Sequence, residues 1–367
     1  GSHALLVRLL PCGVGGRPAS DWLRDLDSLG ARFGGVSGQS WVSIYVEAPA
    51  GRLGPALRIA ADCLSRPDLS PSDIAREKAL LIEEVRTRID RPSALLQREM
   101  IRRLLGDHPY ALEPFGTPEA LAAVDRNALV AAARRVFDPG RTVVGVVGDA
   151  DAAAVASTLL GDLKTPDEGT IQCPAGTFDP DGAGRGRFSL RGPFRQEHVG
   201  IAWPGVASTS PDRLAASVFA NVFSRMSGPL FRHLRDELGI AYATGFSSNA
   251  LRLGGWISAS AAVRRGTGEG AIEGVRKTIE RVLQGGPEAI DEVRRSALHL
   301  AGVEEMTFQK KGAIAHWMCA NLESPLGFDS FLTVARTLRE MDPHAIIALA
   351  RRLLEREPVV GMLVPAD

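Results

Sequence analysis

The chain has few cysteines, no excess charge of either sign and no long apolar run. Its four cysteines show no Cys-x-x-Cys spacing, which argues against a disulfide framework and a zinc knuckle. Lysine and arginine together number 43, as do aspartate and glutamate, so nothing indicates a nucleic-acid partner. No apolar run is long enough to cross a membrane, and we expect no membrane partner. The beginning of the sequence does not resemble an export signal, so we expect a cytoplasmic protein.

The chain has enough length and apolar content for more than one packed core. Its 367 residues, 45% of them hydrophobic, predict two or more domains. Periodic apolar patterns, helix caps and turn residues predict a mixed α+β fold. We expect helices over 57–64, 71–89, 93–105 and 127–137, and strands over 32–37, 41–48, 142–147, 187–190 and 198–203.

An internal repeat divides the chain. Residues 125–137 resemble residues 342–354, with a pair of arginines at the same phase of each predicted helix. An apolar strand is predicted after each helix, at 143–147 and at 359–363. The simplest interpretation is two copies of one α/β domain. The alternative, two unrelated α/β endings of similar composition, does not explain the matching arginines.

Composition sets the expected domain boundaries. Residues 162–186 are rich in Gly, Pro and Asp and predict a linker between a first domain, 1–161, and a second, 187–367. The predicted strands that open the second copy have no counterpart in the first. We therefore expect another segment or another chain to cover the edge of the first sheet, because an unpaired edge is prone to association.

A basic residue and a tyrosine flank a predicted helix end in the second copy. Leu234 and Leu238 lie four residues apart and are expected on one buried face, and Gly239 is expected to end the helix. A strand then begins near Tyr242, so a reversal at Gly239 can bring Arg235 and Tyr242 to one surface. Such a pair can hold a carbonyl oxygen or a carboxylate. The alternative is an arginine capping helix carbonyls beside a tyrosine at a sheet edge.

Five segments of the chain together form a recognisable pattern. They are Gly30-Ala31 with the two strands after it, Glu77 to Glu84, Leu105-Gly-Asp-His-Pro-Tyr110, Phe115-Gly-Thr-Pro-Glu119, and Leu234 to Tyr242. In these segments the sequence resembles the pitrilysin/insulinase metallopeptidases, the inverzincins, over nearly its whole length and in the same order. The resemblance implies two homologous α/β roll domains that face each other as a clamshell.

The likeness fails at the zinc helix. The family carries His-x-x-Glu-His there, two metal ligands and a glutamate that activates water. Matching the segments places Ala4, Val7 and Arg8 at those three positions, and none of these side chains can bind zinc. The third ligand is matched by Glu84, and Glu77 is also retained. We therefore expect no metal in this chain, and we expect the Arg8 guanidinium to neutralise Glu84 or Glu77 in the vacant metal space.

The resemblance also implies a divided site. Some bacterial members resemble heterodimers in which one subunit carries zinc and the other supplies an Arg/Tyr pair, here Arg235 and Tyr242. In that arrangement Tyr242 donates a hydrogen bond to the developing oxyanion, and Arg235 holds a nearby carbonyl or terminal carboxylate of a peptide. The expected partners are a homologous zinc-bearing subunit and a peptide substrate, with zinc only in the partner.

The resemblance also matches a substrate-side edge strand to Gly34, Gly35, Val36 and Ser37. The two glycines would let a peptide backbone approach and add as a strand, or they would mark a bulge.

Two other functions remain open from the sequence. The chain could be a non-catalytic structural or peptide-holding subunit, in which Arg235 and Tyr242 have no role in chemistry. It could also be a self-sufficient zinc peptidase, although Ala4, Val7 and Arg8 argue against that.

Overall fold

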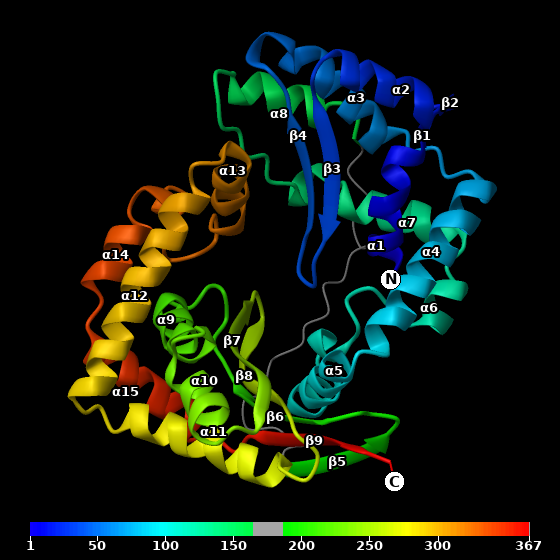
Figure 1. Ribbon diagram of the computed structural model, residues 1–367. Helices are drawn as coiled ribbons and strands as arrows, with labels where there is room; N and C mark the ends of the chain where they lie inside the picture. Colours follow the sequence, from blue (N-terminus) through cyan, green and yellow to red (C-terminus); the bar gives the residue numbers. More distant parts are fainter. Residues whose placement is uncertain (164–185, 367) are drawn as a thin grey trace. The chain divides into compact units, whose positions relative to one another are not determined.

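The computed structural model describes residues 1–163 and 186–366 (Figure 1). Contacts between residues group the chain into two compact units, each described here by itself. The first unit contains Gly1–Arg88, the stretch from Glu113 to the end of the first described range, and Lys310–Cys319. The second contains Ile89–Leu112 and the remaining described residues. The predicted linker lies almost wholly outside the described residues, so its boundaries stay a prediction.

The described part of the first unit is mainly helical, with a long β-hairpin, β3-β4, and a short antiparallel pair, β1-β2. Helix α1 packs against α7 and against β3, and the hairpin strands β3 and β4 pair antiparallel, which confirms the two strands predicted there. The helices are α1 (Ser2–Leu9), α2 (Ala19–Ser28), α3 (Leu53–Ser65), α4 (Pro71–Ile89), α6 (Pro118–Ala122), α7 (Arg126–Val136) and α8 (Ala152–Leu160). The strands are β1 (Gly13–Val14), β2 (Arg17–Pro18), β3 (Arg32–Ser37) and β4 (Val42–Glu47).

The second unit is built on a five-stranded mixed sheet in the order β5-β9-β6-β8-β7, in which only β5 and β9 run parallel. Its strands are β5 (Gly186–Gly192), β6 (Glu197–Pro204), β7 (Ala241–Leu251), β8 (Gly254–Val263) and β9 (Val359–Pro365). Its helices are α5 (Pro92–Leu105), α9 (Arg213–Ser224), α10 (Pro229–Phe231), α11 (Gly268–Leu283), α12 (Pro287–Thr307), α14 (Val334–Glu340) and α15 (Pro343–Leu354). The mixed α+β class predicted from the sequence is confirmed.

Helices cover both faces of this sheet (Figure 1). All residues of the central strand β6 are buried, as expected of a strand enclosed on both sides. A Cβ at Gly200 would meet the side chain of Met100 on α5, whereas the neighbouring Val199 faces the start of α11 at Gly268. Because successive residues of a strand point to opposite faces, α5 and α11 lie on opposite sides of the sheet.

The two sequence halves exchange one helix. The repeat offset of 217 residues, from Asp125 to Asp342, relates α4 to α12, α5 to α13 (Lys311–Ala320) and α7 to α15. Helix α5 comes from the first half but packs on β6 and β9 of the second unit, whereas α13 comes from the second half and belongs to the first unit. Each unit is therefore completed by the corresponding helix of the other half.

The contacts of these two helices are specific. On α5, the buried side chains of Leu96, Met100 and Leu104 join one apolar cluster with Val359 and Leu363 of β9.

In the first unit, the His316 ring of α13 lies 5.1 Å from the ring of Trp41, centroid to centroid. A Cβ at Gly145 would lie 2.7 Å from Cys319 Sγ and 2.9 Å from the Ala315 carbonyl oxygen, so the chain around Gly145 runs directly against α13.

The strand predicted at 142–147 is wrong, since these residues belong to no strand. Their counterpart in the second copy, β9, is hydrogen-bonded to β5 on one side and to β6 on the other. The described part of the first unit holds no strand corresponding to β5 or β6. Without a neighbouring ladder, the apolar sequence has no backbone partners with which to form a strand, and it packs on α13 instead.

The repeated helices α7 and α15 begin in the same way. The side chain of Asp125 accepts a hydrogen bond from the Ala128 N–H, and Asp342 accepts one from the His344 N–H. These caps satisfy backbone donors that a helix start leaves free, and they fix both helices at the predicted place.

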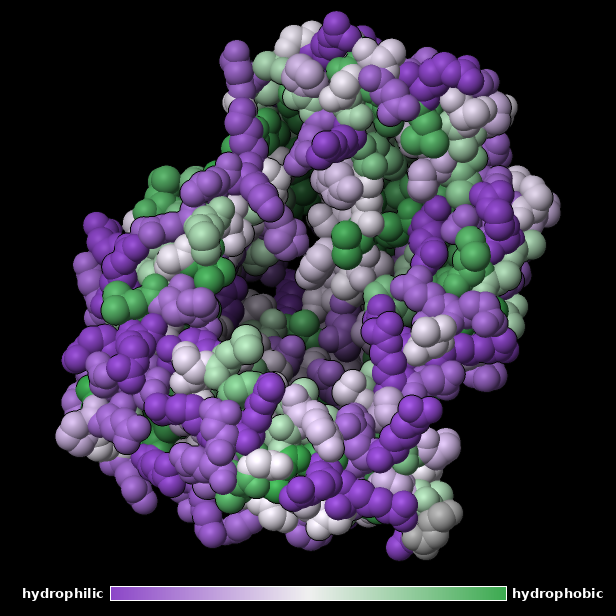
Figure 2. All heavy atoms as spheres, viewed as in Figure 1, coloured by the Kyte–Doolittle hydropathy of each residue, from purple (hydrophilic) through white to green (hydrophobic). Residues whose placement is uncertain are grey.

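Hydrophilic residues predominate on the face shown in Figure 2, with hydrophobic residues scattered among them. In the described part of the chain, no helix combines the length and apolar character that a membrane span requires.

Candidate functional site

Arg235 lies in a turn of π-helix, Arg232–Glu237, here called the π-turn. The turn closes through a hydrogen bond from the Leu238 N–H to the carbonyl of His233, five residues earlier, at 3.0 Å. Gly239 then takes φ +62°, and the Ile240 N–H donates to the Leu234 carbonyl at 3.1 Å. The helix end predicted at Gly239 is confirmed, because glycine readily adopts this left-handed conformation. Sequence periodicity did not indicate the wider turn, and such turns are frequent at functional sites.

The expectation that Leu234 and Leu238 share a buried face is only half right. Leu234 is fully buried, but the side chain of Leu238 is 45% exposed. Both approach Gly274 on α11, where a Cβ would lie 2.6 Å from Leu234 Cδ2 and 3.5 Å from Leu238 Cδ1. A π-turn has more residues per turn than an α-helix, so a side chain four residues on is rotated away from the core.

Tyr242 stands at a second irregularity. The pairing of β7 with β8 shifts register between Ala241 and Ala243, which oppose the neighbouring residues Val263 and Ala262, so Tyr242 is the extra residue of a β-bulge. Bulges redirect a side chain out of the regular pleat and are common beside active sites. The Tyr242 side chain is 62% exposed on the edge strand of the sheet. Arg235 and Tyr242 therefore each lie where the backbone carries one residue more than regular structure needs.

Among the described residues, neither side chain is engaged in a hydrogen bond or an ion pair. The partner found there for Arg235 is the ring of Phe231, whose centroid lies 4.8 Å from the guanidinium carbon. Within the same ranges no hydrogen bond to the Tyr242 hydroxyl is formed. The alternative in which Arg235 caps helix carbonyls is therefore not observed, and both groups are free to bind an external oxygen.

The positions matched to the zinc site by resemblance hold an ion pair. Arg8 Nη1 lies 2.5 Å from Glu84 Oε2, and Arg8 Nε lies 3.5 Å from Glu77 Oε2. The hydrogen bond that Arg8 donates to Glu84 raises the pKa of Arg8 above its usual value, so Arg8 stays positively charged. The side chains of Ala4 and Val7 are buried in the core. The ion pair expected from the sequence is thus present.

No cluster of three His, Cys, Asp or Glu side chains in the described ranges could hold a metal ion. Two carboxylates, both paired with one guanidinium, do not make a zinc site, because such sites require at least three protein ligands.

The edge segment Gly34 to Ser37 forms the end of β3. Its pairing with β4 is regular from Arg32 to Ser37, so the bulge considered for the two glycines does not exist. A Cβ at Gly34 would overlap the ring of the opposite residue Tyr45, and one at Gly35 would lie 2.9 Å from Val7 Cγ1 of α1. These contacts explain both glycines by internal packing. Val36 is 53% exposed, and a role of this segment in binding peptide stays a prediction.

The His-Pro-Tyr segment has a structural role. The Nδ1 atom of the buried His108 accepts a hydrogen bond from the Tyr110 N–H at 3.1 Å. The Tyr110 hydroxyl accepts one from the Leu253 N–H at 3.3 Å, within the second unit.

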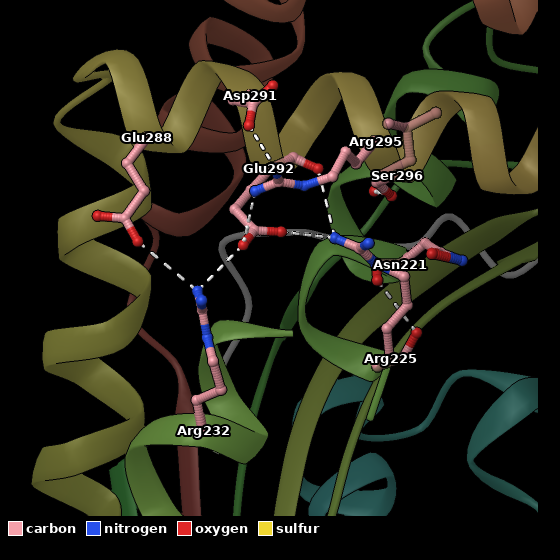
Figure 3. Close-up of polar contacts among 10 residues, drawn as sticks. Asn221, Arg225, Arg232, Glu288, Asp291, Glu292, Arg295 and Ser296 are labelled. Carbon is pink, nitrogen blue, oxygen red and sulfur yellow. Dashed lines mark hydrogen bonds and ion pairs between the residues drawn. The ribbon is translucent and has the colours of Figure 1, made fainter. Parts of the chain in front are cut away.

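One charged group near the π-turn was missed by the sequence analysis. Glu292, on α12, is 4% exposed and is surrounded by three arginines, Arg225, Arg232 and Arg295 (Figure 3). Two of them lie 67 and 60 residues earlier in the chain, so no local spacing could indicate the cluster.

Comparison with known proteins finds one matching family model. The family model described as "Peptidase M16 inactive domain" matches residues 123–296, a range that contains Arg235, Tyr242 and Glu292. Residues 123–296 are therefore similar to the inactive domain of the peptidase M16 family.

Two curated proteins are similar to this chain over its whole length. It is 23% identical over 375 residues to an uncharacterized zinc protease of Streptomyces coelicolor, covering 100% of this chain and 81% of the relative. It is 24% identical over 383 residues to an uncharacterized zinc protease of Mycobacterium leprae, covering 100% and 82%.

Solved structures share the fold. A peptidase M16 inactive domain from Pseudomonas fluorescens superposes with a TM-score of 0.86 at 20% identity, covering 100% of this chain and 89% of that one. A protease from Helicobacter pylori gives the same TM-score at 15% identity and the same coverage.

Proposed function

We propose that this chain is the zinc-free subunit of a heterodimeric peptidase and supplies Arg235 and Tyr242 to a homologous, zinc-bearing partner chain. The observation that carries the proposal is the pair of backbone irregularities. A π-turn and a β-bulge present two exposed, otherwise uncommitted polar groups on either side of Gly239. Irregular backbone at two residues so close in sequence is a cost to stability, which a functional requirement would explain.

The two groups would act on different parts of a bound peptide. The Tyr242 phenol would donate a hydrogen bond to the oxyanion that develops at the scissile carbonyl, and the Arg235 guanidinium would hold a neighbouring carbonyl or a terminal carboxylate. The partner's zinc would supply the activated water. The β3 segment from Gly34 to Ser37 would bind the peptide backbone by strand addition.

The ion pair at the positions matched to the zinc site supports the same proposal. Arg8 fills the space between α1 and α4 and neutralises Glu84 and Glu77, so this subunit has no use for zinc of its own. A related chain that retains His-x-x-Glu-His would then be required for hydrolysis.

The test mixes this chain with such a partner and measures cleavage of a peptide. Tyr242→Phe should lower kcat by about 10²–10³, the usual cost of removing one oxyanion donor. Arg235→Ala should mainly raise KM, because it removes binding of the peptide. Arg276→Ala, an exposed arginine on α11, is the matched control and should leave both constants unchanged.

If both Tyr242→Phe and Arg235→Ala cleave as the unmodified chain does, the shared-site proposal is wrong. The chain would then be a structural or peptide-holding subunit.

A further inference from the structure

A buried carboxylate connects the two ends of the segment that leads to Arg235. Arg225 Nη2 lies 2.7 Å from Glu292 Oε2, and Arg232 Nη2 lies 3.0 Å from Glu292 Oε1 (Figure 3). Arg225 follows the end of α9, and Arg232 is the first residue of the π-turn. The six residues between them are thus held at both ends by one side chain.

The buried charge of Glu292 is fully compensated. A lone carboxylate at 4% exposure would be strongly destabilising, but both of its oxygens accept charged hydrogen bonds. Arg295 Nη2 approaches Oε1 to 3.1 Å from the next turn of α12. Arg225 Nη2 also reaches the Glu292 carbonyl at 3.4 Å. On the outer side, Glu288 lies 3.6 Å from Arg232 and is mostly exposed.

The carboxylate itself is held in place by the helix that carries it. Ser296, one turn after Glu292 on α12, donates a hydrogen bond from Oγ to the carbonyl of Val218 on α9 at 2.8 Å. Ser296 is fully buried, so this bond fixes α12 against α9 within the core. Glu292 therefore anchors the π-turn to the packed interior of the second unit.

We propose that Glu292 is a positioning residue: through Arg225 and Arg232 it sets the conformation of the π-turn and hence the placement of Arg235. This inference rests on the proposed function for the role of Arg235, but its structural part can be tested separately. Glu292 does not touch the proposed peptide. It acts by fixing the backbone from which Arg235 projects.

The structural test is amide hydrogen exchange at the two bonds that close the π-turn, the N–H groups of Leu238 and Ile240. In Glu292→Gln these amides should exchange about tenfold faster or more, as expected from the loss of buried charged hydrogen bonds. Glu288→Gln, on the same helix but at the outer edge of the network, is the matched control and should exchange as the unmodified chain does.

A second variant keeps the inference testable if Glu292→Gln does not fold. In Arg232→Met, Glu292 keeps Arg225 and Arg295, so its charge stays compensated, while the start of the π-turn is released. Faster exchange at Leu238 and Ile240 is expected in this variant too. Unchanged exchange at both amides in Arg232→Met, and in Glu292→Gln if it folds, would overturn the inference.

Peptide cleavage with the partner chain links the two proposals. Glu292→Gln should raise KM, as Arg235→Ala does. The KM of the double variant should be close to that of Arg235→Ala alone, because both substitutions act through the Arg235 guanidinium. Faster amide exchange in Glu292→Gln, with normal peptide cleavage by both Glu292→Gln and Arg235→Ala, would refute the proposed role of Arg235. The inference that Glu292 positions the π-turn would still hold. Additive effects on KM would show that Glu292 acts by another route and would overturn the inference.

Discussion

Arg8 Nη1 on α1 lies 2.5 Å from Glu84 Oε2 on α4, so a guanidinium bridges the two helices that the family resemblance assigns to a zinc site. The packing of α1 against its neighbours is retained: Leu5, Leu6 and Leu9 are fully buried. The structure therefore shows an ion pair, on a helix with a well-packed apolar face, at the positions that the resemblance assigns to the zinc site.

The closeness of Arg8 to Glu84 predicts that substitutions on α1 can create a zinc site beside Glu84. The triple variant Ala4→His, Val7→Glu and Arg8→His places two imidazoles four residues apart on one helix face, beside Glu84. It should bind about one zinc per chain, as measured by metal analysis after dialysis. The double variant Ala4→His and Val7→Glu, which keeps Arg8, is the control and should bind none. A triple variant that folds but retains no zinc would show that α1 and α4 are not placed as a former metal site.

We predict that the π-turn can pack against α11 only because residue 274 is a glycine. Gly274→Ala would place a Cβ 2.6 Å from Leu234 Cδ2, so the π-turn must move or strain, at a cost of about 1–3 kcal/mol in the free energy of unfolding. Gly270→Ala, one turn earlier on α11 with open space at its Cβ, should instead be neutral or stabilising. Urea denaturation of both variants measures the difference, and equal stabilities would contradict the close contact.

Stability should fall in mild acid because of His198 on β6. Its side chain is 8% exposed, and burial lowers its pKa below the ordinary value of 6.5. The unfolded chain therefore takes up a proton at a pH where the folded chain does not, and the free energy of unfolding decreases as the pH falls below about 6.5. His198→Gln should show a smaller decrease between about pH 7.5 and 5.5 in urea denaturation. Parallel curves for the two proteins would exclude His198 as the source.

The exchanged helices predict that the two halves hold together without a covalent link. A protease site placed between residues 164 and 185 should give two fragments that co-elute in gel filtration. Helix α5 buries several large apolar side chains against the sheet of the second half, each contributing about 1.5–3 kcal/mol. In the cleaved chain, Leu96→Ala with Met100→Ala should promote dissociation. Separation of the unmodified cleaved chain into two folded species would refute the prediction.

Local signals in the sequence were sufficient for most elements. Pro71 starts α4 as predicted, and Gly239 ends the π-turn with a positive φ. The pairing of Arg8 with Glu84 also followed from matching residue chemistry to a known pattern.

What the sequence could not reveal depends on hydrogen bonds between distant segments. The bulge at Tyr242 exists only relative to the register of β8. Residues 142–147 form no strand because residues 1–163 offer them no neighbouring strand, and their own composition does not reveal this. The charge cluster at Glu292 unites residues from α9, the π-turn and α12, and no spacing along the chain marks it.

The reciprocal use of α5 and α13 has a consequence for biosynthesis. While the chain is being translated, the first unit remains without one of its helices until the residues beyond 310 have left the ribosome. During that time Trp41 and the chain around Gly145 have nothing from α13 to cover them. The emerging α5 likewise has no sheet on which to dock. We therefore expect both units to reach their final packing only after the second half of the chain has been synthesised.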